Sequence, residues 1–105
     1  MASRAVRLAL NKPNYVNTLG VAYYRLGRFD EAAETLRRNL EQSDHPAHDL
    51  FFLAMTFQKL SQTVKARDYY TQAEYWLSIN EEFLTPSLRE ELEAFRSEAK
   101  ALGLP

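Results

Sequence analysis

Apolar residues recur every three or four positions along the first third of the chain, in two successive stripes. The first stripe contains Val16, Leu19, Gly20, Tyr23 and Leu26, and the second contains Phe29, Ala32, Ala33, Leu36 and Leu40. This spacing places each set on one face of an α-helix, and such a face must be buried against a neighbour. Gly27 separates the stripes and suits the left-handed conformation that often ends a helix. The pattern predicts two antiparallel helices joined by a tight turn.

The same pattern returns after 34 residues. The shift pairs residues of similar size: Leu19 with Leu53, Gly20 with Ala54, Tyr23 with Phe57, Leu26 with Leu60, Ala32 with Ala66, and Leu36 with Tyr70. A fixed period of this length is typical of stacked helical repeats. We therefore expect repeat one at residues 13–46 and repeat two at residues 47–80, with Gly20 facing Ala32 so that paired helices approach closely.

The turn of the second repeat has Ser61 where the first has Gly27. A left-handed conformation at a residue other than glycine costs roughly 1–2 kcal/mol. Two alternatives follow: Ser61 adopts that conformation, or the turn is reshaped with Thr63 as the N-cap of the next helix.

These residues resemble the tetratricopeptide repeat (TPR) signature in type and spacing. The first copy carries the resemblance through Leu19, Gly20, Tyr23, Gly27, Phe29, Ala32 and Leu36, and the second through Leu53, Ala54, Phe57, Leu60, Ala66, Tyr70 and Ala73. Val16 departs from the usual tryptophan and Asn39 from a small alanine. The resemblance implies an all-α, TPR-like solenoid of helical hairpins that acts as a protein-binding scaffold.

The C-terminal stretch, with Trp76 followed by Phe95, Glu98 and Ala99, is similar to TPR arrays appended to large bacterial signalling proteins such as serine/threonine kinases.

Both ends of the chain carry further helix signals. Residues 2–11 fit the helix of a preceding half repeat, with Val6, Leu8 and Leu10 as its apolar groups. We expect a helix at residues 85–103 that caps the end of the repeat stack. Thr85 and Pro86 mark its N-terminus, and it has one apolar stripe and one polar face. The stripe contains Leu88, Leu92, Phe95, Ala99 and Leu102. Residues 77–84 break the repeat and are expected to form a connecting loop or an extended helix end.

Composition narrows the function classes. The 105 residues, 46% of them hydrophobic, suffice for one domain. A net charge of −1 without a basic block disfavours nucleic acid as a partner. The longest apolar run, Leu50 to Met55, is far shorter than the roughly 20 residues that span a bilayer. We therefore expect a soluble, cytoplasmic protein with neither nucleic acid nor a membrane as its partner.

No catalytic motif stands out, so we expect no enzyme activity and no cofactor. His45 and His48, flanked by Asp44 and Asp49, are the only cluster that resembles a metal site. We interpret it as a polar loop and the first turn of the next helix, because no distant third ligand is evident. The many carboxylates are expected on solvated faces or at helix N-termini.

The resemblance places a partner on the concave side of the array, lined by the first helix of each repeat. Carried over by position, the candidate partner-binding residues are Asn14, Asn17, Val21, Tyr24, Arg25, His48, Phe51, Met55, Gln58 and Lys59. The set offers apolar anchors beside the positive charges of Arg25 and Lys59. A peptide or helix with apolar anchors and an acidic neighbour would complement this surface. Phe52 and Asn17 do not match a two-carboxylate clamp for acidic chaperone C-termini, so we do not expect that ligand.

Two readings of function stay open. In the first, the chain is a protein-interaction module that binds a peptide or helix of a partner on its concave face. In the second, it is a structural or oligomerisation segment whose apolar N-terminal edge stacks on other repeats or on a second copy, giving a monomer or a weak homodimer. A further alternative is that Phe51 and Met55 are ordinary core residues covered by the C-terminal helix or loop, which their solvent exposure would decide.

Overall fold

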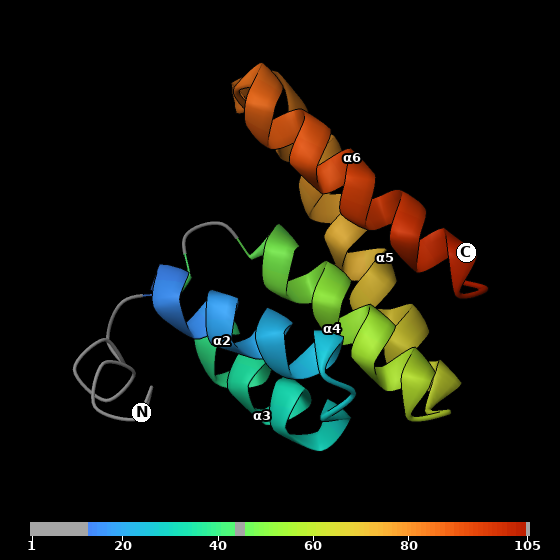
Figure 1. Cartoon of the computed structure of the whole chain (residues 1–105). Helices are drawn as coiled ribbons and strands as arrows, with labels where there is room; N and C mark the ends of the chain where they lie inside the picture. The colour runs from blue at the N-terminus through green and yellow to red at the C-terminus, as the bar shows by residue number, and fades with distance from the viewer. Residues whose placement is uncertain (1–12, 44–45, 105) are drawn as a thin grey trace.

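The computed structural model describes residues 13–43 and 46–104, and for residues 13–17 it describes the backbone alone. These ranges contain helices and no strand: α2 (Pro13–Arg25), α3 (Phe29–Leu40), α4 (Ala47–Lys59), α5 (Thr63–Asn80), the 3-10 helix η1 (Glu81–Phe83) and α6 (Pro86–Ala101) (Figure 1). The predicted all-α fold class is confirmed. The helix expected at residues 2–11 lies outside the described residues.

Two helical hairpins follow one another with an offset of 34 residues. α2 and α4 begin at residues 13 and 47, and α3 and α5 begin at residues 29 and 63. The turns match as well, because φ is positive at both Gly27 (80°) and Ser61 (63°). In each turn an amide donates to a carbonyl five residues earlier, from Arg28 to Tyr23 and from Gln62 to Phe57. These bonds satisfy carbonyls that the preceding helix leaves unpaired.

Ser61 therefore takes the left-handed conformation that the repeat demands. The alternative in which Thr63 caps the next helix is wrong, since α5 begins at Thr63 itself and its N-cap, Gln62, makes no side-chain capping bond.

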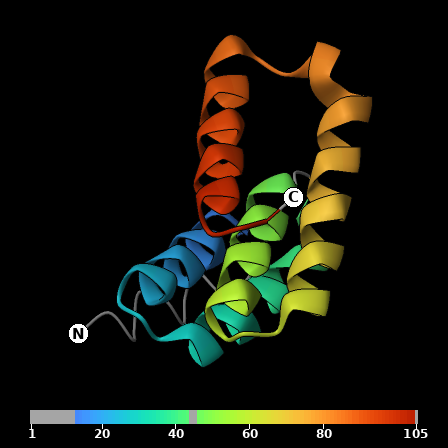
Figure 2. The same ribbon diagram turned by 90° about the vertical axis from the view of Figure 1, so that its right-hand side faces the viewer.

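α4 lies at the centre of the molecule. In both views it lies between the α2–α3 hairpin and α5 (Figures 1 and 2), and it packs against α3, α5 and α6 and touches α2. Its buried residues are Ala47, Asp49, Leu50, Phe51, Phe52, Leu53, Ala54, Met55, Thr56 and Phe57. Since these residues point in all directions around the helix, α4 needs a neighbour on every side.

The C-terminal capping signals are confirmed. The side-chain oxygen of Thr85 accepts a hydrogen bond from the amide of Leu88 (3.2 Å), and Pro86 is the first residue of α6. Of the two expectations for residues 77–84, the extended helix end is observed, because α5 continues to Asn80 and η1 follows directly. α5, with 18 residues, is therefore longer than α4, with 13.

A buried polar pair joins the two hairpins. Asn39 of α3 and Asp49 of α4 are only 2% and 1% exposed. The amide nitrogen of Asn39 lies 2.9 and 2.8 Å from the two carboxylate oxygens of Asp49. The expectation that carboxylates lie on solvated faces or helix N-termini is incomplete here, because Asp49 occupies the first turn of α4 and is also buried. The pair fixes how the second hairpin stacks on the first.

The closest approach of α2 and α3 is at Gly20. A Cβ atom added there would lie 2.6 Å from both Cγ and Cδ2 of Leu36. The atoms nearest to such a Cβ thus belong to Leu36, whereas the sequence predicted that Gly20 would face Ala32. The interhelical distance is set by a large side chain resting on a glycine.

We expect Gly20→Ala to lower the free energy of unfolding by about 1–3 kcal/mol, because overpacking outweighs the gain in helix propensity of about 1 kcal/mol. In a Leu36→Ala background the clash is gone, and the same Gly20→Ala change should become neutral or stabilising. Urea unfolding of the four chains checks the sign reversal. An equal cost of Gly20→Ala in both backgrounds would contradict this packing.

Asn39→Ala should destabilise the chain by about 2–3 kcal/mol, because it removes hydrogen bonds to a buried carboxylate. The double variant Asn39→Ala/Asp49→Ala should regain part of that loss, since neither polar group is then left behind. Thermal unfolding followed by circular dichroism measures both. If the double variant is less stable than Asn39→Ala alone, the pair does not act as described.

Candidate functional site

The ten predicted partner-binding residues fall into four groups. The side chains of Asn14 and Asn17 lie outside the part of the chain that the structure describes. Arg25 and Lys59 are exposed, and Val21, His48 and Gln58 are partly buried. Tyr24, Phe51 and Met55 are buried, the last two completely, at 0% exposure.

The prediction that Phe51 and Met55 offer apolar anchors to a partner is therefore wrong for the chain in this conformation. The alternative, that they belong to the core, holds. The physical reason lies in the neighbours of α4: Phe51 meets the ring of Tyr70 on α5 at a centroid distance of 5.9 Å, and α6 packs on α4 as well.

α6 rests on a surface that we name the α2/α4 face, defined by Arg25, His48, Phe52 and Gln58. His48 meets the ring of Phe95 edge-on at 5.8 Å, and its Nε2 lies 3.3 Å from a carboxylate oxygen of Glu91. Gln58 donates its amide to the carbonyl of Leu102, just beyond α6, at 2.9 Å. Three of the predicted partner-binding residues, Arg25 among them, thus contact the C-terminal helix or its end.

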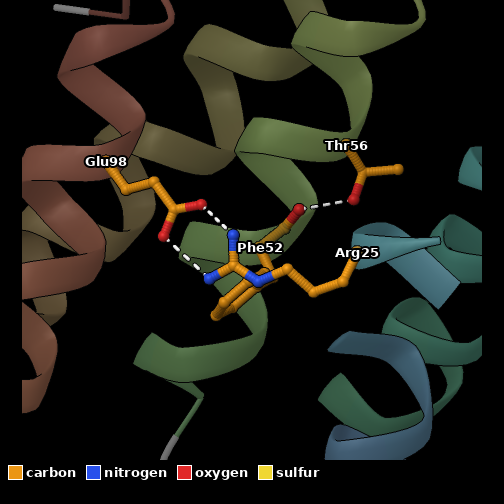
Figure 3. A network of polar contacts seen from close by, with 4 residues as sticks. All are labelled: Arg25, Phe52, Thr56 and Glu98. Atoms are coloured by element: carbon orange, nitrogen blue, oxygen red, sulfur yellow. Dashed lines mark hydrogen bonds and ion pairs between the residues drawn. The ribbon is translucent and has the colours of Figure 1, made fainter. Parts of the chain in front are cut away.

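An ion pair between Arg25 and Glu98 spans the α2/α4 face. Arg25 donates through both terminal nitrogens to the two carboxylate oxygens of Glu98, one of them at 2.9 Å. In Figure 3 the Arg25 side chain reaches from α2 across Phe52 to α6. Its guanidinium carbon lies 5.5 Å from the centre of the Phe52 ring and 5.6 Å from that of Tyr24. A two-pronged ion pair stacked on aromatic rings holds α2 and α6 together over α4.

Aromatic rings form the layer beneath this ion pair. Phe52 packs edge-to-face against Phe95 of α6 at 4.7 Å and against Tyr24 of α2 at 5.6 Å. Such edge-to-face contacts add about 0.5–1.5 kcal/mol beyond the area that the rings bury. Phe52 is therefore the residue of α4 that both α2 and α6 contact.

The electrostatics of the site follow from this packing. Burial, and then the nearby carboxylate of Glu98, raise the pKa of Tyr24. The hydrogen bond that Arg25 donates to Glu98 raises the pKa of Arg25 above its already high ordinary value. The tyrosine therefore stays neutral and the guanidinium stays charged across the physiological pH range.

The described residues include no group of three or more histidine, cysteine, aspartate or glutamate side chains placed to hold a metal ion. His45 of the predicted polar loop lies outside them. None of the described helices is long and apolar enough to cross a bilayer.

No protein-family model, curated protein or solved structure matches the chain.

Sequence reasoning missed the partners of this site. The sequence prediction has Phe52 only as a departure from a carboxylate clamp and Glu98 only in the resemblance of the C-terminal stretch, and it does not single out Glu91. One signal could have found them: Glu91 and Glu98 flank the apolar stripe of α6, and they lie two helical turns apart. α6 thus has the apolar anchors and acidic neighbours that the sequence predicted for a ligand of this face.

We expect Arg25→Ala and Glu98→Ala each to lower the free energy of unfolding by about 1 kcal/mol, a modest effect because surface ion pairs are screened. The two side chains are 51% and 33% exposed. The double variant should cost less than the sum of the single variants, because both remove the same contact. Half a molar salt should reduce this coupling.

Arg25→Lys serves as the control, since it keeps the charge but loses the two-pronged geometry. Its stability should lie between that of the wild type and Arg25→Ala. Strictly additive losses in the double variant, measured by urea unfolding, would show that the two side chains do not interact in solution.

Proposed function

We propose that this chain is a protein-interaction module of the TPR type, not an enzyme, and that its α2/α4 face binds an amphipathic helix with acidic flanks. In the structure α6 occupies this face in cis. The proposal depends on one observation: α6 has the chemistry that the sequence assigns to the ligand, and it lies where that ligand would bind.

The hairpin geometry supports the repeat part of this proposal. Two hairpins offset by 34 residues, with left-handed turn residues at equivalent places, are what a repeat of TPR length produces. Their first helices, α2 and α4, then lie side by side and present the α2/α4 face.

α6 supplies the recognition pattern. Leu92 and Ala99 are buried in the contact, and Phe95 between them inserts against Phe52 and His48. Glu91 and Glu98 flank this stripe and meet His48 and Arg25. A partner helix with the same spacing of two acids around an apolar stripe would make the same contacts.

The contact is also exchangeable. Of the 16 residues of α6, only Leu92 and Ala99 are fully buried, and the short segment that links α6 to α5 is exposed except at Leu84, which is partly buried. A partner helix that buries more apolar area than α6 would displace it. Because α6 must first leave the face, only a helix that binds more tightly than α6 would be bound.

A labelled peptide with the sequence of residues 85–104 tests this proposal by fluorescence anisotropy against the full chain. We expect Phe95→Ala/Glu98→Arg in the chain to raise its affinity for the wild-type peptide by at least about tenfold, because the competing cis helix is weakened. Adding Arg25→Glu to that chain should remove the gain, since the acceptor face is then altered.

The matched control is a peptide carrying Glu98→Arg, which should bind the weakened chain less well than the wild-type peptide. If the wild-type peptide binds the weakened chain no better than the intact chain, α6 is a permanent part of the fold and the proposed exchange is wrong.

A further inference from the structure

α5 has apolar residues on two opposite faces. Its buried face consists of Ala66, Tyr70, Ala73 and Leu77. On the other side, Val64, Tyr75 and Ile79 are 74%, 68% and 52% exposed. With 100° between successive residues, Tyr75 and Ile79 lie one turn apart and nearly opposite the buried stripe. A helix covered on one side only is expected to be polar on its outer side.

The first hairpin shows what the outer side normally contains. The residues 34 positions before Val64 and Tyr75 are Asp30 and Glu41, and both are exposed. At these two positions the first hairpin has charged residues, Asp30 in α3 and Glu41 just after it, where α5 has Val64 and Tyr75. The exposed apolar residues of α5 are therefore not a requirement of hairpin packing.

We name the exposed set Tyr75, Ile79 and Phe83 the α5 ridge. Phe83, in η1, is 77% exposed and follows Ile79 by four residues, so it adds a third large exposed apolar group just beyond the end of α5. This part of α5 lies beyond the span of α4, alongside α6 (Figure 1). Large exposed apolar groups in one line are typical of a protein-binding surface.

Negative charge borders the end of this ridge. Glu81 and Glu82 are exposed, and within the described residues neither carboxylate forms an ion pair. Arg89 donates to the backbone carbonyl of Glu81 and not to its carboxylate. Two uncompensated acids beside an apolar line favour a partner with positive charge.

We infer that the α5 ridge is a docking surface for a basic amphipathic helix of another protein. Apolar residues one turn apart on that helix would cover Tyr75, Ile79 and Phe83, and lysine or arginine beside them would pair with Glu81 and Glu82. A second copy docked through the same ridge would bring these acids together, and an anionic membrane would repel them. A basic helix is the occupant that this charge favours.

The probe is a designed helical peptide with leucines one turn apart and lysines on both flanks, labelled for fluorescence anisotropy with the full chain. We expect Ile79→Glu to weaken its binding by at least about tenfold, because the centre of the apolar contact is lost. Glu81→Lys/Glu82→Lys should weaken it by a similar factor and should create binding to a second peptide in which glutamates replace the lysines.

Leu26→Glu is the matched control: Leu26 is 72% exposed but lies at the end of α2, away from the ridge, so the substitution should leave binding unchanged. The inference is overturned if Ile79→Glu binds the lysine peptide as tightly as the wild type, or if the wild type prefers the glutamate peptide. A concentration-dependent dimer that Ile79→Glu abolishes, or binding to anionic vesicles in place of the peptide, would also overturn it.

The ridge and the α2/α4 face are tested separately. Arg25→Glu should leave the lysine peptide bound, and Ile79→Glu should leave the peptide of residues 85–104 unaffected. Failure of one proposal is therefore distinguishable from failure of the other.

Discussion

The burial of α4 on all its sides is the constraint on which the rest of the structure depends. From Leu50 to Phe57 every residue of this helix is buried, and a fully buried Phe or Leu side chain contributes about 1.5–3 kcal/mol relative to an exposed one. α3, α5 and α6 each supply one wall, and α2 closes the remainder through Tyr24. The position of α6 follows from this need, because without it Phe52 and its neighbours would face water.

This constraint links stability to binding. The contacts that hold α6 are the aromatic layer around Phe52 and the ion pair between Arg25 and Glu98. A partner helix can occupy the α2/α4 face only by replacing these contacts with equivalent ones. Under the proposed function, α6 would act as a filter, since a helix without both the apolar stripe and the acids would leave part of α4 exposed and would not compete.

Much of the fold could be predicted from the sequence, because local signals decide it. Helical periodicity, Gly27 and the Thr85–Pro86 cap gave the α2–α3 hairpin and the start of α6 correctly. Ser61 adopts the same left-handed conformation as Gly27, its equivalent in the first repeat, although serine disfavours a positive φ. The site was harder to predict: Leu50 to Met55 are apolar without interruption, so periodicity could not say which of them face a groove and which face a neighbour.

Two polar contacts between helices could not be predicted from the sequence, because each partner looks like a surface residue when it is taken alone. Arg25 and Glu98 are 73 residues apart, and each alone has the appearance of a solvated charge. Asn39 and Asp49 also look like surface residues until the stacking of the hairpins brings them together and buries them. Polar pairs between helices carry no periodic signal, whereas apolar faces do.

The charges of the two proposed surfaces are opposite, and this difference has a consequence for partner choice. The α2/α4 face contains Arg25 and is proposed to bind an acidic helix. The α5 ridge ends in Glu81 and Glu82 and favours a basic one. An acidic helix that matches α6 would be repelled from the ridge, and a basic helix could not replace Glu98 on Arg25. Like charges would thus keep each proposed ligand off the wrong surface, and the two proposals together describe one small domain with two surfaces of different specificity.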